Sequence, residues 1–167
     1  MMLQENKIKT VLEKQFIYKG YRAYILALPM GHRCGYVEIP INSIFFNKRY
    51  DEKLPIPKSV LNNKVVGKRG VMSLLGFDGE TITMEVLFDV HGSITFSESS
   101  LMDKTNSWFI GFDCAHAGDR PDPSITKAIF ADIDHGFGEI RTLEYVELEL
   151  KSLIDQIIIF EAEYNPS

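Results

Sequence analysis

Residues 142–160 read TLEYVELELKSLIDQIIIF, and apolar side chains recur there at the spacing of one helix face. These apolar positions are Leu143, Val146, Leu150, Leu153, Ile154 and Ile157. Thr142 is a residue type that caps helices, and Glu144 and Glu147 place negative charge near the positive end of the helix dipole. The pattern predicts one long helix over residues 142–160, with an apolar face that packs on the rest of the protein.

Upstream of this helix, the sequence favours strands joined by tight turns. Lys19-Gly20 separates two strand-like runs and predicts a hairpin, and Asp78-Gly79 predicts a second one. The strands expected after the first turn cover residues 21–28, 35–39, 71–77, 81–90, 93–96 and 108–112. The sequence therefore predicts an α+β fold, in which the C-terminal helix packs on a mainly antiparallel sheet.

The size and composition of the chain predict one domain over residues 1–167. A length of 167 residues is typical of a single domain, and 45% hydrophobic with 25% charged residues is ordinary for a globular protein. The segment 42–70 is richer in charged residues and contains Leu54-Pro55-Ile56-Pro57. We expect a loop-rich, partly helical excursion there.

Charge and cysteine content exclude several classes of protein. The 18 basic and 23 acidic residues give a net charge of −5, which argues against a broadly basic nucleic-acid-binding protein. Two cysteines are too few for a secreted disulfide framework. Apolar runs such as Ile157–Phe160 are far shorter than the roughly 20 residues of a membrane span. These features predict a cytoplasmic protein without a membrane partner, and they leave a homo-oligomer open.

All four histidines and both cysteines lie in turns that are rich in small residues. The turns are GHRCG at 31–35, DVHGS at 89–93, GFDCAHAGD at 111–119 and DHG at 134–136. Glycine allows a sharp turn or the close approach of another group, and loops on a rigid sheet are common places for sites. We therefore expect the first three turns to converge into one pocket.

These turns also carry a resemblance. The blocks GHRCGY, DVHGSITF, WFIGFDCAHAGD and TLEYVELEL, within residues 30–40, 86–97, 107–122 and 140–156, resemble a family of small uncharacterised proteins of bacteriophages and prophages. A second glycine is commoner in that family at the position of Ser93, so a less extreme backbone is expected there. The family brings no activity with it. The resemblance implies a phage-type accessory protein, such as one that counters host defence in the host cell cytoplasm.

One interpretation of the reactive residues is a metal site. His32 with Cys34 and Cys114 with His116 form a mirrored pair of His/Cys motifs with one-residue spacers. Two thiolates and two imidazoles are the ligands of a structural zinc site, and another divalent cation is a second possibility. The alternative is that both cysteines are buried as small hydrophobic residues.

A second interpretation is catalysis by a metal-dependent or Cys/His-dependent hydrolase. The candidate catalytic residues are His91, Asp113, Cys114 and His116. An imidazole that a carboxylate orients is a common general base, and a cysteine beside a histidine is a candidate nucleophile. The alternative is structural: the aspartates cap turns and the histidines hydrogen-bond to the backbone.

A third interpretation is the binding of a small anionic, nucleotide-like ligand or of a host defence protein. The residues that would form this site are His32, Arg33, His91, Ser93, Thr95, Trp108, Asp113, His116, Asp119 and Arg120. Arginine binds phosphate through its planar fork, and an aromatic ring can stack on a base. Trp108 has an alternative role at the edge of the core. A virion or assembly protein is a further alternative for the whole chain.

Overall fold

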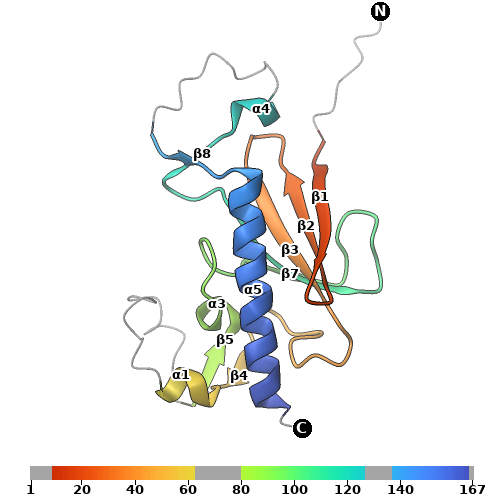
Figure 1. Ribbon diagram of the computed structural model, residues 1–167, viewed down its shortest axis with the longest axis vertical. Helices are drawn as coiled ribbons and strands as arrows, with labels where there is room; N and C mark the ends of the chain where they lie inside the picture. The colour runs from red at the N-terminus through yellow and green to blue at the C-terminus, as the bar shows by residue number, and fades with distance from the viewer. Residues whose placement is uncertain (1–8, 63–79, 127–136, 166–167) are drawn as a thin grey trace, which may run out of the picture.

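The computed structural model of this chain describes residues 9–62, 80–126 and 137–165. Its main body is a five-stranded antiparallel sheet with one long helix, α5 (Leu143–Tyr164), across one face (Figure 1). In sheet order the strands are β1 (Val11–Tyr18), β2 (Tyr21–Ala27), β3 (Arg33–Ile39), β7 (Trp108–Asp113) and β6 (Phe96–Glu98). The predicted α+β architecture is confirmed.

Smaller elements lie near the two ends of α5 (Figure 1). Those near its C-terminal end are β4 (Lys53–Pro55), α1 (Lys58–Asn62), β5 (Thr81–Thr83) and α3 (Met84–Leu87). Those near its N-terminal end are β8 (Asp119–Arg120), α4 (Pro123–Thr126) and β9 (Glu139–Ile140). β4 pairs with β5 in antiparallel orientation, and β8 pairs with β9 in parallel.

Helix α5 begins where the sequence predicts and ends one turn later. The Thr142 side chain accepts a hydrogen bond from the backbone N–H of Tyr145, as a helix cap does. The helix continues beyond residue 160 because its last turn has contacts of its own. The Tyr164 ring packs edge-on against Phe45, and its hydroxyl donates to the carbonyl of Pro55.

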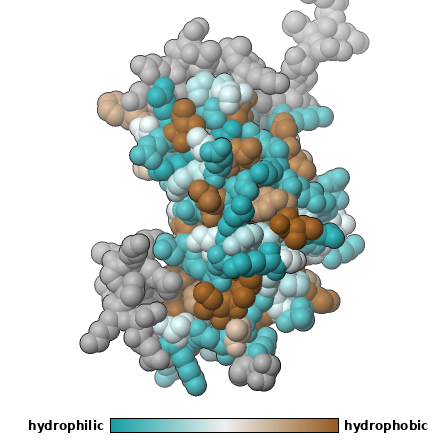
Figure 2. All heavy atoms as spheres, viewed as in Figure 1, coloured by the Kyte–Doolittle hydropathy of each residue, from teal (hydrophilic) through white to brown (hydrophobic). Residues whose placement is uncertain are grey.

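The core lies between α5 and the sheet. The buried helix positions are Val146, Leu150, Leu153, Ile154, Ile157 and Phe160. They pack with alternate residues of the strands, among them Ile25, Val37, Ile110 and Phe112. The outer face of α5 is mostly hydrophilic with scattered apolar patches (Figure 2), and no helix in the described ranges is long and apolar enough to cross a membrane.

The first predicted hairpin is confirmed. Lys19 and Gly20 both have positive φ, at 48° and 87°, and they connect β1 to β2. A two-residue turn of this kind matches the twist of the strands that it joins.

Strand β1 has one irregularity in its pairing with β2. The register shifts between Leu12 and Lys14, around Glu13.

Two strand predictions need correction. The segment 81–90 is a strand only as far as Thr83, and Met84–Leu87 form a short helix that buries Met84 and Leu87 three residues apart. The strand expected over 93–96 begins at Phe96 instead, because Ser93 has a φ of 101°, which an extended strand does not allow.

Parts of several predictions lie outside the described residues. These parts are the strand over 71–77, the turn at Asp78-Gly79, the turn at 134–136 and residues 63–70 of the excursion. The described part of the excursion, 42–62, consists of turns, β4 and α1.

Candidate functional site

The site is built on a tight turn at residues 90–93. The backbone N–H of Ser93 donates to the carbonyl of Val90, and Gly92 has a φ of 68°. A Cβ atom at position 92 would lie 2.2 Å from Cε1 of His116. Position 92 therefore requires glycine both for its backbone and because the His116 ring packs directly on it.

The expectation that a serine at position 93 goes with a less extreme backbone conformation is wrong. Its φ of 101° lies in the region that side chains rarely adopt, so the strain is retained by a residue with a Cβ. We expect Ser93→Gly to raise the free energy of unfolding by about 1 kcal/mol, measured by urea denaturation. The control Ser100→Gly changes an exposed serine without positive φ, and it should not stabilise the protein. Equal effects of the two variants would contradict this account.

Asp119 lies at the centre of the site, and its side chain is almost completely buried. Its Oδ2 accepts hydrogen bonds from Nε2 of His91 at 2.7 Å and from the backbone N–H of His116 at 3.0 Å. Its Oδ1 accepts from Nε of Arg141 at 2.8 Å. Burial alone would raise the pKa of Asp119, but these hydrogen bonds outweigh it and hold the pKa at about 2. Asp119 is therefore a carboxylate at neutral pH.

His91 is held on both sides of its ring. Nδ1 lies 2.9 Å from the hydroxyl of Tyr145, and Nε2 faces Asp119. The backbone N–H of His91 donates to Oε2 of Glu149 at 2.8 Å. Both partners on the helix come from the first turns of α5, so this helix fixes the position and orientation of the imidazole.

His116 is the solvent-facing member of the site. Its side chain is 38% exposed, compared with 12% for His91 and 2% for Asp119. Its Nδ1 lies 3.7 Å from Oδ2 of Asp119 and 3.7 Å from Oδ1 of Asp113. The rings of His91 and His116 meet edge to face with centroids 5.8 Å apart. The second and third of the three turns that were expected to form one pocket therefore lie against each other, whereas His32 of the first turn is not part of this group.

Three side chains of types that can bind a metal ion converge here. One ligand atom from each of His91, His116 and Asp119 lies within 4.8 Å of the others. Among the described residues, these three form the group of His, Cys, Asp or Glu side chains that could hold a metal ion. We call these three residues the His/His/Asp cluster. Two imidazoles and one carboxylate suit zinc and related transition-metal ions.

Arg33 is brought near the cluster but is occupied by other groups. Its guanidinium donates to both carboxylate oxygens of Glu13, at 2.6 and 3.0 Å, and to Asp122 at 2.7 Å. A further bond goes to the carbonyl of Arg141, and the Arg33 side chain is only 6% exposed. This corrects the prediction that Arg33 receives an anionic ligand, since two carboxylates already fill that role.

The two cysteines lie in different hydrophobic clusters. Cys34 packs with Tyr24 and Tyr36, whereas Cys114 belongs to the core beneath α5. Burial raises the pKa of the Cys34 thiol to about 11 and that of Cys114 to about 12. Neither is a thiolate at neutral pH, which is the form that attacks substrates and binds metals. The four-residue set His32, Cys34, Cys114 and His116 is thus not assembled, and Cys114 is poorly suited as a nucleophile.

The remaining predicted residues are distributed along the sheet. The Thr95 hydroxyl donates to Oδ2 of Asp113 at 3.0 Å, and Arg120 follows Asp119 in β8. Trp108 begins β7, five residues before Asp113, which places it about 17 Å away along an extended strand. It packs against Phe46, which favours its alternative role at the core edge over stacking on a ligand in this site.

Three contributors to the site were not expected from the sequence: Arg141, just before the predicted helix, and Tyr145 and Glu149 within it. Arg141, Tyr145 and Glu149 contact Asp119, the His91 ring and the His91 backbone respectively. Tyr145 and Glu149 are four residues apart and therefore share one face of α5. In the sequence, the only sign of this role was the spacing of Tyr145 and Glu149, which puts both polar residues beside the apolar face of the helix.

The chain has been compared with family models, curated proteins and solved structures. None of the three comparisons finds a match. The resemblance to phage and prophage proteins therefore stays a prediction.

Proposed function

We propose that this protein binds a divalent transition-metal ion, represented by zinc, through the His/His/Asp cluster and uses it in a hydrolytic reaction. The observation that carries the proposal is the approach of three ligand atoms to within 4.8 Å of one another. They come from the turn at 90–93 and from the segment 113–119, which are far apart in sequence. Such convergence is the usual construction of a metal site.

The contacts around the cluster support this assignment. Metal-binding histidines usually give their second ring nitrogen to a hydrogen-bond partner, which fixes the ring and its tautomer. The hydroxyl of Tyr145 occupies that place at Nδ1 of His91, so a metal ion would bind at Nε2 in place of the proton that faces Asp119. The Asp119 carboxylate is likewise oriented by Arg141, whose guanidinium carbon lies 4.9 Å from the centre of the Tyr145 ring.

The number of ligands favours a catalytic site over a structural one. Structural zinc sites have four protein ligands, whereas catalytic sites have three and keep one position for water or substrate. The exposure of His116 would let water or a substrate reach an ion held by the cluster. A zinc ion held by His91, His116 and Asp119 would supply the Lewis-acid chemistry that a hydrolytic reaction needs.

A metal ion would also allow the site to bind the anionic ligand that the sequence led us to expect, because its positive charge offsets the nearby carboxylates. Without an ion, the carboxylates of Asp113, Asp119 and Glu149 oppose the approach of an anion, because Arg33 is not available to it. With an ion, the free coordination position would accept a phosphate or carboxylate oxygen. In the expected phage-type context, the substrate would be a small anionic molecule of the host.

Zinc titration tests this proposal. We expect wild-type protein to retain about one zinc ion per chain after dialysis, measured by elemental analysis, with an affinity determined by competition with a chromogenic chelator. His116→Ala should lose this binding, because it removes a ligand at an exposed position without opening the core. His32→Ala is the matched control, since His32 lies outside the cluster, and it should bind zinc as wild type does. Absence of zinc from wild-type protein, or equal loss in both variants, would overturn the proposal.

A second experiment separates hydrolysis from binding alone. Zinc-loaded protein is incubated with bis(p-nitrophenyl) phosphate and p-nitrophenyl acetate as probes of phosphoester and carboxylic ester hydrolysis. Zinc-dependent release of p-nitrophenol by wild type, but not by His116→Ala, supports a hydrolase. Zinc binding with no hydrolysis of either probe would contradict the hydrolytic part of the proposal and leave metal binding intact.

A further inference from the structure

Strand β1 forms one edge of the sheet, and its outer side is unpaired in the described part of the chain. It pairs with β2 on one side and ends the strand order on the other (Figure 1). The opposite edge strand, β6, has three residues, whereas β1 has eight. A long edge strand offers free backbone N–H and C=O groups to a further strand. β1 is therefore the edge at which this sheet can be extended.

The charged side chains of β1 are neutralised by partners within the same chain. Glu13 accepts two hydrogen bonds from Arg33, at 2.6 and 3.0 Å, and Lys14 pairs with Glu147 of α5. Edge strands are often protected from association by charged side chains. Because both charges of β1 are already paired, they do not protect this edge in that way.

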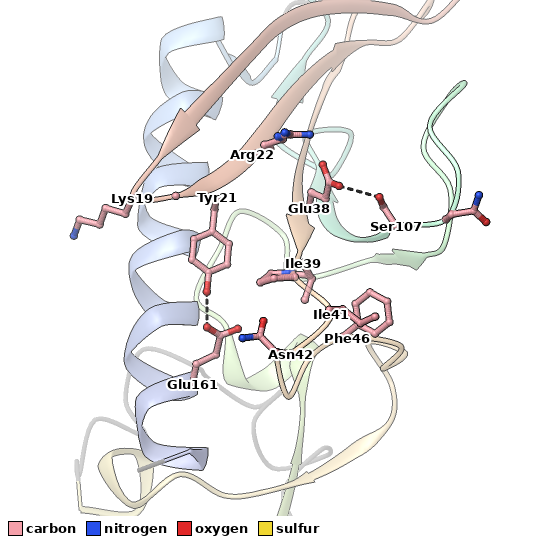
Figure 3. A pocket seen from close by; sticks show the side chains of 13 residues that line it. Lys19, Tyr21, Arg22, Glu38, Ile39, Ile41, Asn42, Phe46, Ser107 and Glu161 are labelled. Atoms are coloured by element: carbon pink, nitrogen blue, oxygen red, sulfur yellow. Dashed lines mark hydrogen bonds between the residues drawn. The ribbon is translucent and has the colours of Figure 1, made fainter. Parts of the chain in front are cut away.

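The turn end of β1 is fixed on α5. Lys19 pairs with Asp155 at 2.7 Å, and the hydroxyl of Tyr21 donates to Glu161, as Figure 3 shows. These contacts hold the hairpin of β1 and β2 against the helix. The edge is therefore held in one position, so little conformational freedom is lost when another strand binds to it.

β1 also exposes apolar side chains on the face of the sheet opposite α5. Leu12 is 40% exposed and Ile17 is 68% exposed. An apolar groove of about 260 Å³ lies beside Leu12, and Leu26, Leu101 and Met102 contribute to its lining. A strand that covers these side chains would gain the free energy of apolar burial.

The backbone of β1 defines how a second strand can pair with it. Tyr18 and Tyr21 flank the two-residue turn and face each other across the hairpin. Since the direction of the backbone groups alternates along an antiparallel strand, those of Ile17 and Gln15 point to the free edge. A second β1 in antiparallel orientation, centred on Gln15, would form hydrogen bonds with these groups.

The side chains of β1 are complementary to themselves in this register. Ile17 of one copy lies opposite the irregularity at Leu12 and Glu13 of the other, where it covers the exposed Leu12. Lys14 lies opposite Phe16, so no two like charges face each other. We propose that two copies of this chain form a two-fold symmetric dimer through β1, which joins their sheets into one continuous sheet. The proposal is independent of the metal site, because β1 contributes no residue to the His/His/Asp cluster.

Sedimentation equilibrium of the full chain tests this proposal. We expect wild-type protein to have twice the chain mass of 19.0 kDa. Gln15 is exposed, and Gln15→Glu or Gln15→Lys places two like charges opposite each other at the two-fold axis. Each variant alone should therefore dimerise about tenfold more weakly or worse. An equimolar mixture of the two should recover the affinity of wild type, because a carboxylate then faces an ammonium group.

Ile17→Glu tests the apolar contact, and Ile41→Glu is its control. The first change places a carboxylate beside Leu12 and opposite Glu13, so it should weaken the dimer about tenfold or more. Ile41 is 82% exposed and follows β3, so Ile41→Glu should remain dimeric.

Three results would overturn the proposal. A monomeric wild type would show that β1 does not bind a second copy and would leave its edge to a different partner. A dimer that persists in both Gln15 variants would show that the copies associate through another surface. Failure of the mixed Gln15 variants to recover the dimer would contradict the register centred on this residue.

Discussion

Replacing Asp119 with asparagine is expected to lower the affinity for zinc by about 100-fold or more. The change preserves the size of the side chain but removes the negative charge that faces both imidazoles. It also removes the counter-charge of Arg141, so one side of the site becomes net positive. The affinity is measured by chelator competition at neutral pH, and circular dichroism establishes that the variant is folded.

Asp113→Asn is the matched control for this prediction. Asp113 lies in the same segment, and its Oδ1 is 3.7 Å from the His116 ring, yet it is outside the His/His/Asp cluster. We expect its loss to lower zinc affinity by less than about tenfold. Similar losses in the two variants would mean that general negative charge, rather than coordination by Asp119, attracts the metal.

Arg33→Met is expected to cause the largest loss of stability, about 3 kcal/mol or more. The guanidinium of Arg33 joins Glu13 of β1 to Asp122, the residue before α4, and it also reaches the backbone before α5. Methionine can fill much of the volume, but it removes the ion-pair partner of Glu13 and leaves Asp122 with only its hydrogen bonds from Ser124. Urea denaturation of the variant and of wild type at neutral pH gives the difference in free energy of unfolding.

Arg49→Met provides the comparison. Arg49 pairs with Asp51 at 3.0 Å, but its side chain is 69% exposed. An exposed ion pair contributes little, so the free energy of unfolding should change by less than about 1 kcal/mol. A comparable small change in Arg33→Met would show that the buried network of Arg33 does not stabilise the contact between β1, β3 and the segment before α5.

The parts of the fold that could be predicted are those with strong local signals. The hairpin at Lys19-Gly20 and the helix capped by Thr142 depend on neighbouring residues, whose spacing is visible in the sequence. The alternation of residues 81–90 is also a local signal, but it was outweighed by packing. Met84 and Leu87 are both fully buried in a short helix beneath the core, a position that no local pattern specifies.

The candidate site could be predicted in part for the same reason. Gly92 marks a sharp turn beside His91, and the glycine-containing segment after β7 carries His116 and leads to Asp119 at the start of β8, so the placement of these residues at turns was visible. The partners that decide their chemistry are distant in sequence. Tyr145 is 54 residues from His91, and Asp122 is 89 residues from Arg33, so only the folded chain shows that the first orients an imidazole and the second neutralises an arginine.

Cys34 and Cys114 illustrate the limit of spacing arguments. Each lies two residues from a histidine, which suggested a four-ligand zinc site. Successive residues of a strand face opposite sides of a sheet. Cys34 pairs with Asp113, so Cys114 faces the other side and the two thiols enter different hydrophobic clusters. The histidine and aspartate of the segment 113–119 combine instead with His91, from a turn that the mirrored motif did not include.

X-ray absorption at the zinc edge of zinc-loaded wild-type protein tests the central claim most directly, because it reports the atoms bound to the metal. The His/His/Asp cluster predicts only nitrogen and oxygen neighbours at about 2.0–2.2 Å, with the multiple-scattering pattern of two imidazoles. A sulfur shell at about 2.3 Å would contradict this assignment and restore a site with Cys34 or Cys114. A spectrum without imidazole scattering would exclude His91 and His116 as ligands and contradict the account as well.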